Sequence, residues 1–172
     1  MAEPSLTLRT DKGEKLTITE MDNNLRYLDK GYLNYFDISS GATTVIPSVN
    51  TWVKVNSTTT QGISKNGLSH SNNRITKVSE GELPYHVTGI IVVRAGAGDE
   101  LEVAIFKNEE LFPCSVVAMR THTPGAGDRV NPVPFQCFIN LDEDDFIEVY
   151  IRNVTDDTNV TLETLNMACK EI

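Results

Sequence analysis

Cysteine is scarce in this sequence, and the few cysteines present form no recognisable site. Three occur among 172 residues, and no two of them are spaced as C-x-x-C. An odd number at wide spacing argues against the disulfide framework of a small secreted domain and against a zinc or redox motif. We therefore expect all three to be small apolar side chains in the interior. They are Cys114, Cys137 and Cys169.

Long apolar stretches are also missing. Residues 1–15, MAEPSLTLRTDKGEK, contain no apolar core, so we expect no signal peptide. No segment approaches the roughly 20 apolar residues of a membrane-spanning helix. These absences predict a protein that is neither exported through a signal peptide nor inserted in a membrane.

Positive charge is in short supply. The chain has 15 lysines and arginines against 24 aspartates and glutamates, a formal net charge of −9. This balance argues against a role built on nucleic-acid phosphates or on an anionic membrane surface, so we expect neither partner. The hydrophobic fraction of 40% and the charged fraction of 23% are ordinary globular values, and the length suits one domain with a short extension.

Motifs that carry catalytic chemistry are absent as well. The three histidines lie far apart and lack metal-ligand spacing to one another or to a cysteine. No G-x-S-x-G nucleophile motif occurs. We therefore expect no enzyme activity, no metal and no cofactor. The histidines are His70, His86 and His122.

Three loop segments resemble ligand sites only superficially. AGAGDE at 95–100 and PGAGD at 124–128 have the glycines of a phosphate loop, but such a loop needs a helix behind it. The sequence LEVAIF after the first segment is typical of a strand. The acidic DEDD at 142–145 lacks the alternating ligands of a calcium loop. We expect hairpin turns at the first two segments and a solvated β-turn at the third.

One short helix is predicted near the N-terminus. Thr17 and Glu20 form a capping-box pattern, in which each side chain can accept a free backbone N–H of the first turn. Gly31 offers a stop, so the helix covers about 17–30. An apolar stripe repeats at i, i+4 and i+7 along it: Met21, Leu25 and Leu28. Because a helix of about three turns is marginal alone in water, this stripe should be buried, either against its own domain or against a partner.

The rest of the chain reads as strands. Alternating segments such as WVKVNST at 52–58 and the longer apolar YHVTGIIVVRA at 85–95 are rich in β-branched and aromatic residues. The second suits a central strand. Residues 57–73 read as loop with at most one short strand, and RITKVS at 74–79 as an edge strand. Eight to ten strands separated by turns predict an all-β, antiparallel jelly-roll sandwich over 34–172, preceded by an N-terminal arm, 1–33.

The closing segment, 139–172, resembles the last strands of the complement/tumour-necrosis-factor-like jelly roll. In that family an apolar residue and a Gly-Asp turn precede an alternating strand that ends in asparagine. Here Leu141 takes the apolar position, Asp145 the turn aspartate and Asn153 the strand end. Asp144 stands in place of the glycine, and aspartate tolerates a left-handed backbone. The matching strand residues are Phe146, Ile147, Val149 and Ile151.

Residues 87–111, VTGIIVVRAGAGDELEVAIFKNEEL, resemble central strands of the same family, with KNEE at its "KNG"-like turn. The resemblance spans roughly 50–172. It implies a homotrimer that packs apolar and aromatic side chains around a threefold axis. The candidate contacts, each of which can instead be an ordinary core residue, are Tyr85, Phe135, Phe138 and Tyr150.

A shorter stretch, GEKLTITEMDNNLRYLD at 13–29, is similar to N-terminal segments of tailed-bacteriophage virion proteins with the pattern G-x-x-L-T-x-x-E-M-D-x-N-x-x-x-L. This resemblance implies a structural protein that is made in the host cytoplasm and assembled into the virion. The matching residues are Gly13, Leu16, Thr17, Glu20, Met21, Asp22, Asn24 and Leu28.

Together the two resemblances imply a capsid decoration (cement) protein whose trimers bind the major capsid protein, or another virion protein, and stabilise the shell. The alternative is a tail fibre or receptor-binding tip that contacts the host surface through loops 57–73 and 121–134. A third and weaker hypothesis is a non-viral secreted ligand of the same fold, because no signal peptide is expected. The expected attachment residues are Leu16, Ile18, Met21, Leu25 and Leu28.

Overall fold

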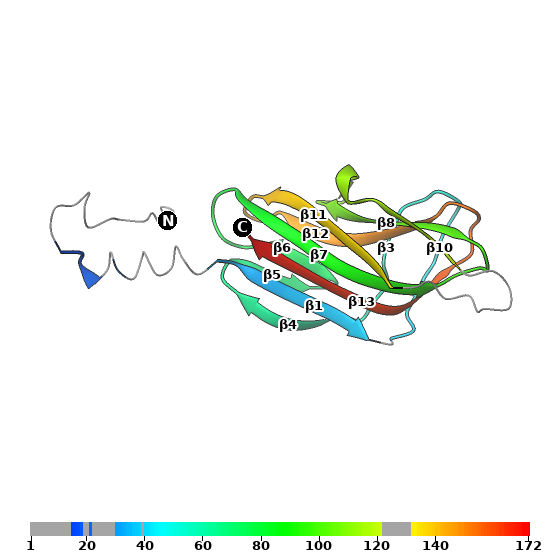
Figure 1. Ribbon diagram of the computed structural model, residues 1–172, viewed down its shortest axis with the longest axis horizontal. Coiled ribbons are helices and arrows are strands. Elements are labelled where there is room, and N and C mark those ends of the chain that lie inside the picture. The colour runs from blue at the N-terminus through cyan, green and yellow to red at the C-terminus, as the bar shows by residue number, and fades with distance from the viewer. Residues whose placement is uncertain (1–14, 19–20, 22–29, 39, 122–131) are drawn as a thin grey trace.

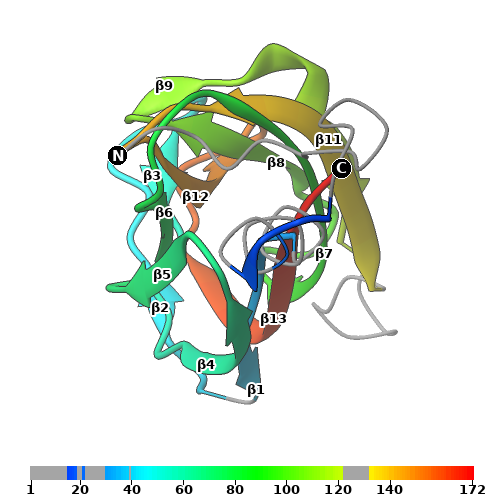
Figure 2. The same ribbon diagram turned by 90° about the vertical axis from the view of Figure 1, so that its left-hand side faces the viewer.

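The computed structural model describes residues 15–18, 21, 30–38, 40–121 and 132–172. Within 30–38, 40–121 and 132–172 the chain forms antiparallel strands and one short 3-10 helix, η1 (Pro113–Ser115). The strands make two sheets that face each other as a sandwich, which is seen most clearly from the end where the described chain enters it (Figure 2). The predicted antiparallel all-β architecture is confirmed.

The first sheet has the strand order β11-β7-β13-β1-β4, and β2 adds to one end of β13 (Figure 1). The predicted central strand is confirmed, because β7 lies between β11 and β13. The strands of this sheet are β1 (Tyr32–Ile38), β2 (Thr43–Thr44), β4 (Thr60–Lys65), β7 (Leu83–Arg94), β11 (Val133–Leu141) and β13 (Val160–Glu171).

The second sheet has the order β10-β8-β12-β6-β5, with β3 paired to β12 and β9 paired to β8. RITKVS does not form an edge strand, because β6 pairs with β12 on one side and β5 on the other. The strands of this sheet are β3 (Val53–Lys54), β5 (Leu68–Ser71), β6 (Arg74–Lys77), β8 (Glu100–Lys107), β9 (Glu110–Leu111), β10 (Val117–Arg120) and β12 (Phe146–Asn153).

Strict alternation of side chains decides which face of each strand is buried. Along β7 the inward positions Tyr85, Val87, Ile91 and Val93 are at most 1% exposed. Gly89 completes this inward series, and the ring of Phe135 on β11 occupies the space that a side chain would need there. The core is one apolar layer between the two sheets.

The chain enters and leaves the sandwich at the same end, which we call the arm end (Figure 1). Gly31 N–H donates to the Glu171 carboxylate (2.8 Å), and Glu171 N–H donates to the Gly31 carbonyl (2.9 Å). The connections β7–β8 and β12–β13 lie at the opposite, loop end. Asn153 links them, because its buried Nδ2 donates to Asp99 (3.0 Å) and to Asp156 (2.8 Å).

Several turn predictions hold, and one needs correction. Asp144 adopts the left-handed φ of 64° that was expected where the family that this segment resembles has glycine. Residues 142–145 form the expected β-turn, in which Asp145 N–H donates to the Asp142 carbonyl (3.1 Å). The segment 95–100 is a turn but not a hairpin, because β7 and β8 belong to different sheets and the segment crosses between them. PGAGD at 124–128 lies outside the described residues.

Other differences from the sequence-based expectation concern boundaries and cysteines. Regular pairing begins at Tyr32, just before the expected boundary between residues 33 and 34. The segment 57–73 holds two strands, β4 and β5, rather than at most one. Cys137 and Cys169 are buried as expected, and burial raises the pKa of the Cys137 thiol to about 12. Cys114 is instead exposed, because it lies on the protruding η1 turn.

Candidate functional site

The outward side of the first sheet, formed by β11, β7, β13 and β1, is the candidate site, and we call it the outer face. Its side chains fall into rows that the strand register defines. The first row is Phe138, His86, Lys170 and Tyr32, each directly opposite the next. The next two are Gln136, Thr88, Ala168 and Asn34, then Pro134, Ile90, Asn166 and Phe36.

The outer face exposes large apolar side chains to an unusual degree. Phe138 is 64% exposed and Ile90 is 37% exposed. The Phe138 ring stacks on the His86 ring at 4.8 Å with an interplanar angle of 25°, so it is held in place by a neighbour on β7. Phe138 lies in the first row and Ile90 in the third, with the row of Gln136 and Thr88 between them.

Charge is nearly absent from the same area. Lys170 is the one permanently charged side chain among the described positions of the three rows. In contrast, charged residues make up 23% of the whole sequence. Depletion of charge together with exposed aromatic residues distinguishes the core of a protein interface from ordinary surface. The outer face therefore suits contact with another protein surface.

The structure separates the four predicted trimer contacts. Tyr85 and Phe135 are 1% and 2% exposed and belong to the protomer's own core, so they are not available to a second subunit. Tyr150 lies on the second sheet, where its ring stacks on Phe106 with centroids 3.9 Å apart. Phe138 alone lies on the outer face. The alternation of side chains along β11 explains why Phe138 is exposed and Phe135 is buried. The two residues are three positions apart on one strand, so their side chains point to opposite sides of the sheet.

Sequence reasoning missed the other apolar residues of the outer face, among them Ile90 and Phe36. Both lie in one row through Asn166, although they are far apart in the chain. The alternation of β7 could have placed Ile90 opposite to Ile91, and hence outward. The row itself follows only from the register of three strands.

The arm is partly described, and its first turn matches the prediction. Met21 N–H donates to the Thr17 carbonyl (3.0 Å), the helical bond expected if Thr17 is the N-cap. Ile18 is 74% exposed and Met21 is 45% exposed. Of the two predicted alternatives, burial of Met21 against its own sandwich is therefore not seen in the single protomer, and burial against a partner stays a prediction. Leu25 and Leu28 lie outside the described residues.

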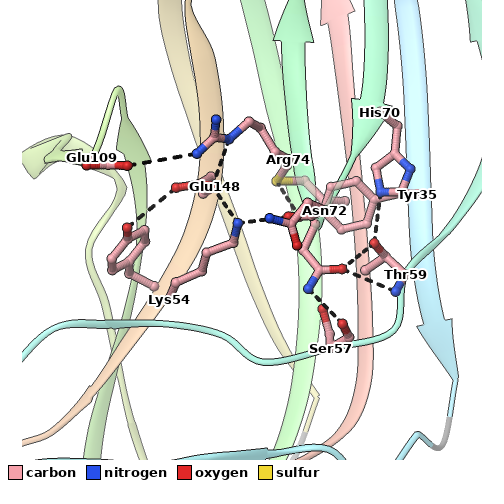
Figure 3. Close-up of polar contacts among 12 residues, drawn as sticks. Tyr35, Lys54, Ser57, Thr59, His70, Asn72, Arg74, Glu109 and Glu148 are labelled. Carbon is pink, nitrogen blue, oxygen red and sulfur yellow. Dashed lines mark hydrogen bonds and ion pairs between the residues drawn. The ribbon is translucent and has the colours of Figure 1, made fainter.

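A second group of polar side chains lies on the outward side of the second sheet (Figure 3). Glu148 is 1% exposed there, and its Oε1 accepts from Lys54 Nζ (2.6 Å) and from Arg74 Nε (2.9 Å). Tyr150 OH lies 3.4 Å from the other carboxylate oxygen, and burial together with Glu148 raises the pKa of Tyr150. These ion pairs join β3, β6 and β12, so the group serves to hold three strands together.

His70 and Thr59 are close enough to raise the question of a nucleophile and its base. The Thr59 hydroxyl donates to Asn73 Oδ1 (2.6 Å), since Asn73 Nδ2 is committed to the Ser57 carbonyl (2.7 Å). His70 Nε2, 2.8 Å from the Thr59 oxygen, then acts as a donor and not as a base. Burial also lowers the pKa of His70. The contact is a structural link between β4 and the β5–β6 hairpin.

Two further properties of the described part of the chain bear on ligands. No three histidine, cysteine, aspartate or glutamate side chains come together there in a way that could hold a metal ion. Among the same residues, no helix has the length and apolar content needed to cross a membrane.

Comparison with known proteins adds the fold. No family model matches the chain, and no curated protein matches its sequence. The structure is similar to murine APRIL at pH 5.0, with a TM-score of 0.56 and 10% identity over 83% of this chain and 99% of that chain. It is also similar to the PRD1 vertex protein P5, with a TM-score of 0.56 and 17% identity over 84% of this chain and 98% of that chain. These likenesses confirm the predicted antiparallel jelly-roll fold.

Proposed function

We propose that this chain is a non-enzymatic structural protein of a phage virion, which self-associates through its outer face into a trimer and decorates the capsid. The outer face, with Phe138 exposed on its edge strand β11 and Lys170 as the one permanent charge in its three rows, is the observation that carries the proposal. The similarity to a vertex protein of PRD1 supports a virion role. The N-terminal segment similar to phage virion proteins points in the same direction.

The occupant of the outer face is a second copy of the chain. Covering a large apolar side chain contributes roughly 1.5–3 kcal/mol, and such side chains lie in the first and third rows of the outer face. Most soluble assemblies of identical chains have closed symmetry, and the jelly-roll resemblance favours three subunits. If the symmetry axis runs along the strands, the arms of all copies leave at the same end.

The arm is the proposed attachment element, which binds the major capsid protein or another virion protein. Ile18 and Met21 are exposed apolar side chains at its described helical turn. A short helix with an exposed apolar stripe gains stability only when a partner covers the stripe. The proposed contacts are Leu16, Ile18, Met21, Leu25 and Leu28.

Phe138→Asp is expected to convert the trimer into a folded monomer, because the new carboxylates would lose water on association without gaining partners. Light scattering should give close to three times 19.0 kDa for the natural chain and 19.0 kDa for the variant. Val49→Asp is the matched control, since Val49 is 46% exposed and lies off the outer face, in the connection between β2 and β3. A natural chain that stays monomeric at micromolar concentration, free and on the virion, would contradict the trimer.

Copy number distinguishes the decoration role from the tail alternative. A decoration protein covers the shell, so a calibrated gel of purified virions should show on the order of hundreds of copies of this chain. A few copies, up to a few tens, would instead indicate a tail fibre or receptor-binding tip. That outcome would turn attention to the loop end, where Asn153 holds the connections in fixed positions.

A further inference from the structure

The first row of the outer face places a titratable ring beside a permanent cation. His86 on β7 lies between Phe138 on β11, on which it stacks, and Lys170 on β13, which is directly opposite in the register. Directly opposed residues of antiparallel strands have their Cβ atoms roughly 4.5–5.5 Å apart. The polar neighbour is Gln136, whose Oε1 is 3.4 Å from His86 Nε2.

The two carboxylates nearest the first row have hydrogen-bond partners of their own. One of them lies on the same face, because Asn140, which Glu82 binds, has the same outward parity on β11 as Phe138. Glu82, before β7, accepts from Asn140 Nδ2 (2.5 Å). Glu171 accepts a hydrogen bond from the Gly31 N–H (2.8 Å). On β13 it lies opposite Tyr85, whose side chain points into the core, so Glu171 is on the other side of the sheet from His86. The other titratable group of the row is Tyr32, which faces Lys170 from β1. A protonated His86 would therefore face Lys170 with no carboxylate in its row.

Protonation matters little in a free protomer but strongly in an assembly. In water a second positive charge beside Lys170 is hydrated and screened. Covering the outer face with another copy removes that water, strengthens the repulsion and brings the same pair from the neighbouring subunits closer. Protonation of His86 would therefore cost more free energy in an assembly than in a free protomer. By linkage, acid shifts the equilibrium toward free protomers.

We propose that His86 makes self-association acid-sensitive, so that the assembly holds at neutral pH and dissociates in mildly acidic solution. This inference rests on the proposed function, since it requires that the outer face bind a second copy. Histidine side chains change charge around pH 6.5, so the effect should develop between about pH 7 and pH 5.5.

The test is the dissociation constant of the full chain, measured by sedimentation at about pH 7.5 and about pH 5.5. For the natural chain we expect it to rise by about tenfold or more at the lower pH, because like charges would be opposed across a covered face. In His86→Gln it should change by less than about twofold. The chain has three histidines, so His70→Gln and His122→Gln are matched controls that should keep the natural pH dependence.

The outcomes separate the two proposals. A natural chain that is monomeric at both pH values would overturn self-association itself, and with it this inference. A stable assembly whose dissociation constant is independent of pH would overturn the inference alone. The same holds if His86→Gln dissociates in acid as the natural chain does. Thermal unfolding of each variant at both pH values shows whether acid acts on association or on the fold.

Discussion

A chain that lacks residues 1–30 is expected to fold and self-associate normally, yet to be missing from virions. The cut falls before Gly31 because the two hydrogen bonds between Gly31 and Glu171 close the end of the sandwich. None of the core residues precedes Leu33 in the described part of the chain, so the sandwich keeps its apolar layer. Deletion removes the entire proposed attachment surface, so incorporation into virions should fall below detection.

The measurement is the amount of the chain in purified virions when the shortened form is supplied in place of the natural one. Two point variants refine it: Met21→Asp places a charge in the exposed apolar stripe, and Lys15→Asp changes charge just before it. Met21→Asp should reduce incorporation sharply, and Lys15→Asp should not. Normal incorporation of the shortened chain would show that the arm is not the anchor.

Gly89→Ala is expected to destabilise the sandwich by about 3 kcal/mol or more, the upper range for adding volume to a packed core. A Cβ at Gly89 would overlap the Phe135 ring and would lie 2.6 Å from the Asn166 carbonyl oxygen. The carbonyl belongs to β13, which pairs with β7, so it cannot move without breaking the central ladder. The ring is enclosed by the core and has nowhere to turn.

Thermal unfolding measures this effect directly. For a chain of this length, a loss of about 3 kcal/mol lowers the Tm by roughly 6–12 °C. Gly62→Ala is the control, because Gly62 lies on the exposed edge strand β4. A Cβ there would meet only the amide end of the Asn34 side chain, which comes from the neighbouring strand β1. That amide can swing away at the loss of one hydrogen bond to Ile63 N–H. Equal Tm values for the two variants would contradict the packing argument at Gly89.

The sequence predicts the parts of this fold that have one strong local signal. The long apolar run of β7 marks a strand covered on both edges, and the Asp144 turn could be recognised because aspartate tolerates its positive φ. Strand β4 was missed because all its residues are exposed, so no buried side imposes an apolar alternation. Sequence patterns detect a strand through its buried apolar side chains, and an exposed edge strand has almost none.

The candidate site was harder to predict for a different reason. Phe138 could be listed from its residue type, but only the parity of β11 separates it from Phe135. Tyr150 looks similar in sequence and lies on the other sheet, since the assignment of strands to sheets depends on long-range pairing. The outer face is a product of register between β11, β7, β13 and β1, and no single segment contains it.

The shared position of Gly31 and Ile172 has a practical consequence for engineering. A peptide or reporter joined after Ile172 would emerge beside Gly31, where the arm begins, and would be directed toward the shell if the chain decorates a capsid through its arm as proposed. An insertion after the exposed Ala97 would emerge at the opposite end, provided that Gly98, whose φ is +87°, is kept. Foreign epitopes intended for display therefore belong in the crossing between β7 and β8, whereas cargo intended to lie against the particle belongs at the C-terminus.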